Sequence, residues 1–101
     1  MASLRVEFKA AASAHIEEAC EFYSEKASVR LAAKFLQSVD RAVRQLGEFP
    51  LSCPEFAYGA RRKRLDGFPY WIYHRFSTDR VDVLAGLHSK RSPGLHRKNS
   101  H

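Results

Sequence analysis

Several basic residues in the second half of the chain could act on a phosphate group. Metal-free cleavage of RNA needs a group that takes the 2′-hydroxyl proton, cations that stabilise the phosphate, and an acid for the leaving oxygen. Histidine suits the proton transfers, and arginine suits the phosphate. Arg62 and Arg64 are two residues apart and would share one face of a strand. A site of this kind would lie on the face of the predicted sheet that is opposite the predicted helices. The candidate catalytic residues are His88, Arg91, Arg62 and Arg64.

A different role for His88 is also open. The sequence places no evident carboxylate partner for this histidine, and Pro93 and Gly94 follow it in the tail. The alternative is a structural histidine that caps its strand and orients the tail. The protein would then act by binding, without acid–base chemistry.

The distribution of charge favours a binding role. The chain carries 17 lysines and arginines and 11 acidic residues, a net charge of +6. Residues 1–50 are balanced, with seven of each, so residues 51–101 carry the whole excess. Such a basic half suggests a polyanionic partner, either nucleic acid or an acidic protein segment. The alternative is a basic surface that only keeps the protein soluble.

The residues expected to contact a partner lie in this basic half. Trp71 and Tyr73 would share a strand face, and aromatic and basic side chains together suit nucleic acid or the apolar anchors of a protein. The alternative for the two aromatic residues is a half-covered outer face with no binding role. The candidate binding residues are Arg61, Arg62, Arg64, Trp71, His88 and Arg91.

Other classes of protein are not favoured. Cys20 and Cys53 are too few for a disulfide framework, and five scattered histidines make no metal motif, so we expect no metal and no cofactor. No apolar run approaches the ~18 residues of a membrane span. The N-terminus lacks the apolar stretch of a signal peptide, which predicts a cytoplasmic protein.

The elements that position these residues follow from hydrophobic periodicity. The period is two at the N-terminus, changes to helical spacing, and returns to two after Pro50. Ser13 and Ser28 are candidate helix caps, and 48–59 is an expected loop. The expected helices are 13–26 and 29–46, and the expected strands are 3–8, 60–66, 69–77 and 80–88.

The helices form a hairpin that must cover one face of the sheet. We expect an α+β, two-layer fold with an N-terminal strand, a helical hairpin and a three-stranded antiparallel meander. A single domain would span 1–101, with a basic, frayed tail at 92–101. The residues expected in the core are Phe35, Leu36, Val39, Val43 and Leu46 of the second helix, with Tyr70, Ile72 and Phe76 of the sheet. His74 is expected to be partly buried and hydrogen-bonded, and His15 to be solvated.

The order of these motifs resembles the RelE/ParE toxins of bacterial type II toxin–antitoxin systems. The most specific motifs are Arg62-Lys-Arg-Leu65, Phe68-Pro-Tyr-Trp-Ile-Tyr73 and the ending Val83-Leu-Ala-Gly-Leu-His88 with Lys90-Arg-Ser-Pro93. The resemblance covers about 90 residues and is closer to the ParE-like branch, because of the Phe-Pro-Tyr element and the ending from His88 to Pro93.

The resemblance implies a toxin that is silenced by a cognate antitoxin through an acidic amphipathic segment. ParE-like members act on DNA gyrase, whereas RelE-like members cleave messenger RNA on the ribosome. Active RelE-like enzymes usually carry a tyrosine near the C-terminus, and this chain has none after Tyr73. We therefore expect a gyrase inhibitor whose toxicity depends on the basic region from His88 to Lys98. The alternative is a metal-independent, ribosome-dependent endoribonuclease. Operator DNA would be bound only through the antitoxin.

Overall fold

Two helices and five strands make up the part of the chain that the structure, a computed structural model, describes: residues 3–91. The predicted α+β class is confirmed. The basic tail expected at 92–101 lies outside the described residues. The elements are β1 (Arg5–Phe8), α1 (Ala10–Lys26), α2 (Val29–Glu48), β2 (Glu55–Ala57), β3 (Ala60–Arg64), β4 (Tyr70–Ser77) and β5 (Arg80–His88).

The five strands form one sheet in the order β1-β5-β4-β3-β2. The predicted antiparallel meander is β3, β4 and β5. β1 joins it by pairing in parallel with β5, so the first and last strands of the described chain lie side by side. β2 was not predicted. It pairs antiparallel with β3 inside the expected loop and forms one edge of the sheet.

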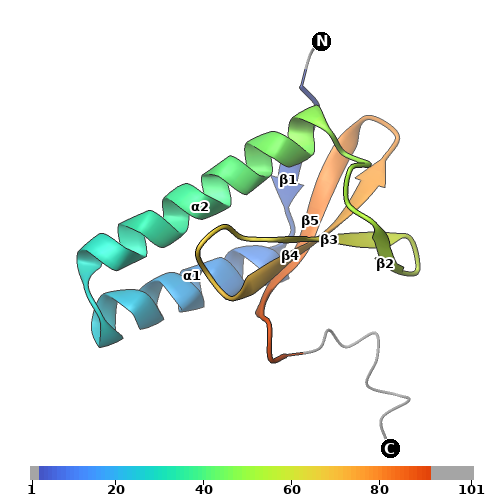
Figure 1. Cartoon of the computed structure of the whole chain (residues 1–101). Coiled ribbons are helices and arrows are strands. Elements are labelled where there is room, and N and C mark those ends of the chain that lie inside the picture. The colour runs from blue at the N-terminus through green and yellow to red at the C-terminus, as the bar shows by residue number, and fades with distance from the viewer. Residues whose placement is uncertain (1–2, 92–101) are drawn as a thin grey trace, which may run out of the picture.

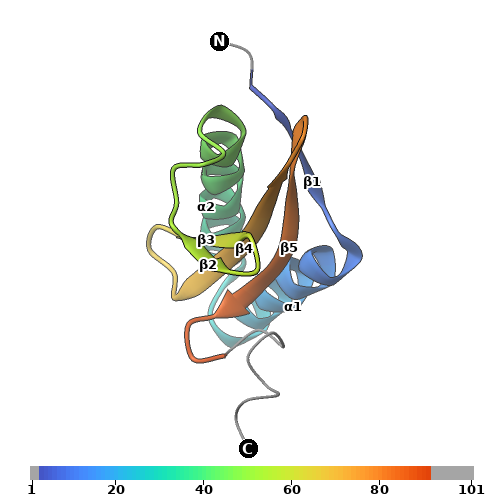
Figure 2. The same cartoon turned by 90° about the vertical axis from the view of Figure 1, so that its right-hand side faces the viewer.

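The helical hairpin lies on one side of this sheet, and Figures 1 and 2 show α1 and α2 running antiparallel beside each other. α1 packs mainly against β5. The end of α2 meets the N-terminal segment, where the backbone N–H of Leu4 donates to the carbonyl of Gly47 at 2.9 Å. Within residues 3–91, no helix is long and apolar enough to cross a membrane. The buried core consists of Ala12, Ile16, Ala19, Phe35, Val39, Ala42, Leu46, Leu65, Ile72, Val81 and Val83.

The two predicted caps have different outcomes. Ser28 caps α2, because its side-chain oxygen accepts the N–H of Leu31 at 3.0 Å. The prediction for Ser13 is wrong. α1 begins at Ala10, and the N–H of Ser13 already donates to the carbonyl of Lys9 in a helical hydrogen bond. Three small alanines precede Ser13, and alanine is the best helix former, so the helix extends through them.

Two residues expected in the core are exposed. Leu36 is 44% exposed and Phe76 is 38% exposed. The buried stripe of α2 is narrower than its apolar stripe, so Leu36 lies at the rim, while Val43 is half-buried against the core. Phe76 lies one residue before the end of β4. Tyr70 is half-buried, whereas Phe35, Val39, Leu46 and Ile72 are buried as predicted.

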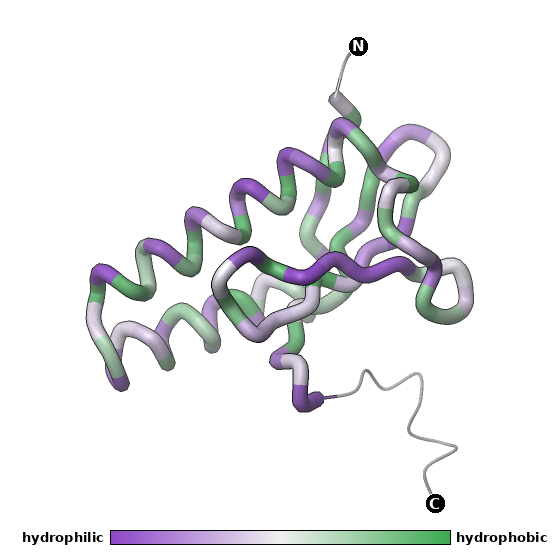
Figure 3. The backbone as a smooth tube through the Cα atoms, in the orientation of Figure 1, coloured by the Kyte–Doolittle hydropathy of each residue, from purple (hydrophilic) through white to green (hydrophobic). Residues whose placement is uncertain are grey.

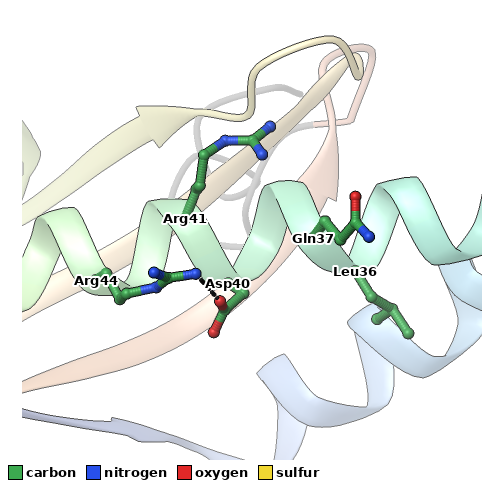
Figure 4. Close-up of a pocket in the computed structure, with 5 residues that line it drawn as sticks. All are labelled: Leu36, Gln37, Asp40, Arg41 and Arg44. Atoms are coloured by element: carbon green, nitrogen blue, oxygen red, sulfur yellow. Dashed lines mark hydrogen bonds and ion pairs between the residues drawn. The ribbon is translucent and has the colours of Figure 1, made fainter.

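Leu36 instead borders a polar hollow on the outer side of α2. Figure 4 shows this hollow, which Gln37, Asp40, Arg41 and Arg44 also line. Asp40 and Arg44 form an ion pair one helical turn apart. No residue of the predicted site lies here, so the hollow takes no part in the chemistry considered above.

A β-bulge in β5 changes which side chains face the helices. Tyr73 of β4 pairs with Ala85, but the next residue, His74, pairs with Val83. Leu84 is therefore the extra residue of the bulge in this pair of strands. Because side chains alternate between faces with period two, one extra residue moves every later side chain of β5 to the opposite face.

The residues after the bulge confirm this exchange of faces. A Cβ atom on Gly86 would lie 2.9 Å from the Cδ1 atom of Ile16, so Gly86 faces α1. Leu87 lies on the outer face, where it pairs with Trp71 and is 5% exposed. His88, two residues after Gly86, returns to the helix side.

Candidate functional site

The outer face of the sheet carries a group of aromatic and basic side chains, which we call the outer-face cluster: Phe56, Arg62, Arg64, Trp71 and Tyr73. Three adjacent strands supply it. Arg62 pairs with Tyr73 and Arg64 pairs with Trp71 in the register of β3 and β4, so all four side chains lie on one face. Figure 3 shows that β3 is hydrophilic along most of its length.

Stacking on aromatic rings fixes the position of Arg62. Its guanidinium carbon lies 4.1 Å from the ring centroid of Trp71 and 4.6 Å from that of Phe56. Arg64 lies over the same indole at 5.4 Å. Both distances for Arg62 are well within the ~6 Å range of a cation–π interaction. Within residues 3–91, the guanidinium of Arg62 has neither a hydrogen bond nor an ion pair.

Buried residues of the outer face support this cluster. Tyr73 is only 3% exposed, so it is more deeply covered than the half-covered outer face that was one of the two alternatives for it. The cover comes from β2, whose Phe56 ring packs edge-on against Tyr73 with centroids 5.4 Å apart. Trp71 itself is half-buried. The unpredicted strand β2 therefore builds one wall of the cluster.

Arg61 does not belong to the cluster, although it was a candidate binding residue. It lies one position before Arg62 and points to the other face, where it pairs with His74. Its guanidinium donates to the backbone carbonyl of Cys53, which anchors the loop before β2. Arg61 therefore has a structural role on the helix side of the sheet.

His88 and Arg91 also lie away from the cluster. His88 pairs with Tyr70, and their rings are 5.3 Å apart on the helix side. The Nδ1 atom of His88 accepts the N–H of Lys90 at 3.1 Å, and its carbonyl accepts the N–H of Arg91 at 2.9 Å. Burial raises the pKa of Tyr70, and the charge of Arg91 opposes that rise. The four catalytic candidates therefore do not meet on one face.

His74 is the buried titratable group on the helix side of the sheet. It is 0% exposed, and neither ring nitrogen has a hydrogen-bond partner within residues 3–91, so the expected hydrogen bond is wrong. Burial, together with the nearby positive charges of Arg61 and Lys63, lowers the pKa of His74 to about 4. His74 is thus held neutral, as a core residue.

His15 has a defined partner instead of the solvated position expected for it. Its Nδ1 atom accepts the backbone N–H of Gly86 at 3.2 Å, which links α1 to β5 just after the bulge. Among the described residues, no group of three or more histidine, cysteine or acidic side chains could hold a metal ion.

The carboxylates of the outer face are paired at its opposite end. Asp82 accepts a hydrogen bond from Arg80 at 2.9 Å, and Glu7 lies 3.8 Å from the same arginine. The hydrogen bond from Arg80 lowers the pKa of Asp82. These acids are therefore committed to local ion pairs, while the positive charge of the outer-face cluster has no acidic counterpart within residues 3–91.

Comparison with known proteins identifies the family. The sequence model described as "ParE toxin of type II toxin-antitoxin system, parDE" matches residues 6–93. The chain belongs to the ParE toxin family. The match includes both helices, the outer-face cluster, strands β2 to β5 and all of β1 except Arg5. The predicted resemblance to the RelE/ParE toxins, closer to the ParE-like branch, is confirmed.

A solved structure supports the fold of this ParE toxin. The chain is similar to a chain of the chromosomal ParDE TA system from P. aeruginosa, with a TM-score of 0.76 and 17% sequence identity. The similarity covers 85% of this chain and 96% of that chain. No curated protein sequence matches the chain.

Sequence reasoning found most of the outer-face cluster of this ParE toxin but missed Phe56. The signal for Phe56 was available, because Glu55-Phe-Ala57 precedes Tyr58-Gly59, and a glycine in such a position is typical of a hairpin turn. Both turn residues have positive φ, 51° for Tyr58 and 78° for Gly59. The two prolines before them favoured the interpretation of the whole segment as a loop.

Proposed function

We propose that this ParE toxin acts by binding DNA gyrase and that a cognate antitoxin neutralises it in the cytoplasm. The observation that carries the proposal is the separation of His88 from Arg62 and Arg64. A general acid or base must lie within hydrogen-bond reach of the reacting atoms that the cations hold. The bulge turns His88 to the helix side, whereas Arg62 and Arg64 face outward. This arrangement suits a protein that presents a binding surface.

The surroundings of His88 support the same conclusion. Its Nδ1 atom accepts a backbone N–H, so this nitrogen is already used in ordering the turn after β5. Its ring packs on Tyr70, which in turn packs on Phe35 of α2 with centroids 5.3 Å apart. These contacts favour the structural role for His88.

The proposed antitoxin would bind the helical hairpin. Large apolar side chains on the hairpin are exposed: Phe22 by 54%, Val29 by 74% and Leu36 by 44%. Exposed groups of this kind are the usual contacts for apolar anchors of a partner. Acidic residues of the antitoxin would meet the exposed Arg91, which would speed association and select the partner.

Expression in bacteria without the antitoxin tests the mode of action. Inhibition of gyrase should give filamentous cells and induction of the SOS response before protein synthesis falls. Purified toxin should also increase the amount of cleaved DNA trapped on gyrase. A halt in translation before any SOS response, with cleavage of ribosome-bound messenger RNA, would contradict the proposal and favour the endoribonuclease.

Replacement of His88 by Gln separates the two mechanisms. Gln keeps a hydrogen-bonding side chain but cannot carry out imidazole acid–base chemistry, so the variant should keep most of its effect on gyrase. A nuclease that uses His88 as general acid or base would lose about 10²–10⁴ in rate. The matched control is Arg41→Ala on α2, which changes an exposed side chain that belongs to neither candidate site.

A further inference from the structure

The guanidinium of Arg62 is held in a way that prepares it to bind an anion. The rings of Trp71 and Phe56 lie within 4.6 Å of its carbon atom, so stacking fixes the guanidinium in place. Stacking uses the face of the group and leaves the N–H donors at its edge. No hydrogen bond or ion pair within residues 3–91 uses these donors. A planar fork of donors that is fixed in advance matches phosphate or carboxylate oxygens.

A second arginine lies at a suitable distance along β3. Arg62 and Arg64 are two positions apart on one strand face, which separates their Cα atoms by about 7 Å. Arg64 shares the indole of Trp71, with its guanidinium carbon 5.4 Å from the ring centroid. Its Nε–H approaches the carbonyl of Phe68 only at 3.5 Å, the limit of a hydrogen bond. Two cations at this separation can meet neighbouring phosphates of one nucleic-acid strand.

The same stacking indicates which part of a partner the cluster can bind: a base, an apolar side chain or a phosphate group. Trp71 and Phe56 are the large aromatic groups that remain half-buried on this part of the face, while Tyr73 and Leu87 are almost fully buried. Arg62 covers both half-buried rings. A flipped base would find no free ring to stack on, and an apolar anchor of a protein would meet a cation. The cluster can therefore recognise charge and spacing, which favours a phosphodiester backbone.

We propose that Arg62 and Arg64 bind two phosphates of a duplex DNA backbone without reading the base sequence. The proposal rests on the proposed function in one respect: the duplex would be the DNA that gyrase holds. It differs from operator binding, which was predicted to occur only through the antitoxin. Two aromatic rings hold the guanidinium of Arg62 in place, whereas the guanidinium of Arg64 contacts one ring at a longer distance and can adjust to the second phosphate.

Direct binding to DNA tests this proposal. The purified full-length toxin is titrated into a short fluorescein-labelled duplex, and anisotropy is measured at several salt concentrations. The variants are Arg62→Ala, Arg64→Ala, Arg62→Lys and the control Arg41→Ala, each checked for its fold by circular dichroism. Arg41 is an exposed arginine of α2 and no member of the cluster, so its replacement removes the same charge from a different element.

The expected result is specific to the cluster. Each of the first two variants should lower the slope of log K against log salt by about one, with up to about fivefold weaker binding at low salt. Arg62→Lys keeps the charge but loses the planar fork, so it should bind more weakly than wild type. Arg41→Ala should match wild type, and changing the base sequence of the duplex should have little effect.

Three results would overturn the inference: no binding of the duplex at low salt, equal losses in Arg41→Ala and Arg62→Ala, or tighter Arg62-dependent binding of a glutamate-rich peptide of equal charge. Trapping of gyrase is measured with the same variants. DNA binding through Arg62 without any effect on gyrase would refute the proposed function and leave this inference intact. Gyrase trapping that survives loss of both arginines, with DNA binding unchanged, would refute only the inference.

Discussion

The burial of His74 predicts that the folded protein loses stability in mild acid. The folded state holds this side chain neutral, with a pKa of about 4. Its position between Val83 on β5 and Arg61 on β3 provides no route to water for a proton on the ring. In the unfolded chain the same imidazole would have the ordinary pKa of about 6.5. Between these values the unfolded state binds a proton that the folded state excludes.

The size of the effect follows from the two pKa values. Because the unfolded state takes up the proton, stability is fully present above pH 6.5, falls as the pH decreases, and levels off below about pH 4. A difference of one unit in pKa corresponds to about 1.36 kcal/mol, and the folded and unfolded values differ by about 2.5, so His74 should account for about 3 kcal/mol. This is a large part of the free energy of unfolding of a typical domain, which is about 5–15 kcal/mol.

Urea unfolding of wild type and His74→Leu at pH 7, 6, 5 and 4 measures this contribution. Leu removes the titrating group and fills a similar apolar space, so the difference in free energy of unfolding should change with pH by about 3 kcal/mol. The difference cancels acid groups common to both proteins, among them Asp82, whose low pKa also makes stability fall in acid. Parallel pH profiles for the two proteins would refute the reasoning.

Three further predictions concern packing and capping. Phe35→Ala should lower the free energy of unfolding by about 3–5 kcal/mol in urea titrations, because Phe35 is fully buried, whereas the exposed Leu36→Ala should cost clearly less. Gly86→Ala should destabilise by about 1–3 kcal/mol, because its Cβ atom would meet the Cδ1 atom of Ile16; adding Ile16→Val, which removes that atom, should restore part of the melting temperature, and a double variant that melts no higher than Gly86→Ala would contradict this cause. Ser28→Ala should cost about 1 kcal/mol through loss of the α2 cap, and an unchanged melting temperature would contradict that role.

Most of the fold could be predicted from periodicity. The strong helical spacing of α2 and the period of two in β3, β4 and β5 gave their positions to within a few residues. Two features could not be predicted in this way. β2 has only three residues, Glu55–Ala57, too few to show a period. The side chain of Leu36 fits the apolar stripe of α2, but it lies at the rim of the part that is buried and is 44% exposed.

The site was predicted in part, and the bulge explains what was missed. Arg62, Arg64 and Trp71 lie together because strands β3 and β4 keep a regular register. His88 was expected on the same outer face because Val81, Val83, Ala85 and Leu87 alternate without interruption in the sequence. Nothing in that pattern marks Leu84 as an extra residue. A bulge is decided by pairing with the neighbouring strand, which a single sequence does not show.

The parallel pairing of β1 with β5 has a consequence for the synthesis of this toxin. Arg5 pairs with Arg80, 75 positions later, so β1 stays without its partner until almost all of the described chain has been made. Contacts between such distant residues slow folding, because a long loop must close first. A growing chain on the ribosome therefore carries an unfinished sheet for nearly the whole time of translation, and the outer-face cluster exists only after β4 has joined β3. A nascent chain that ends before β4 therefore lacks the outer-face cluster altogether.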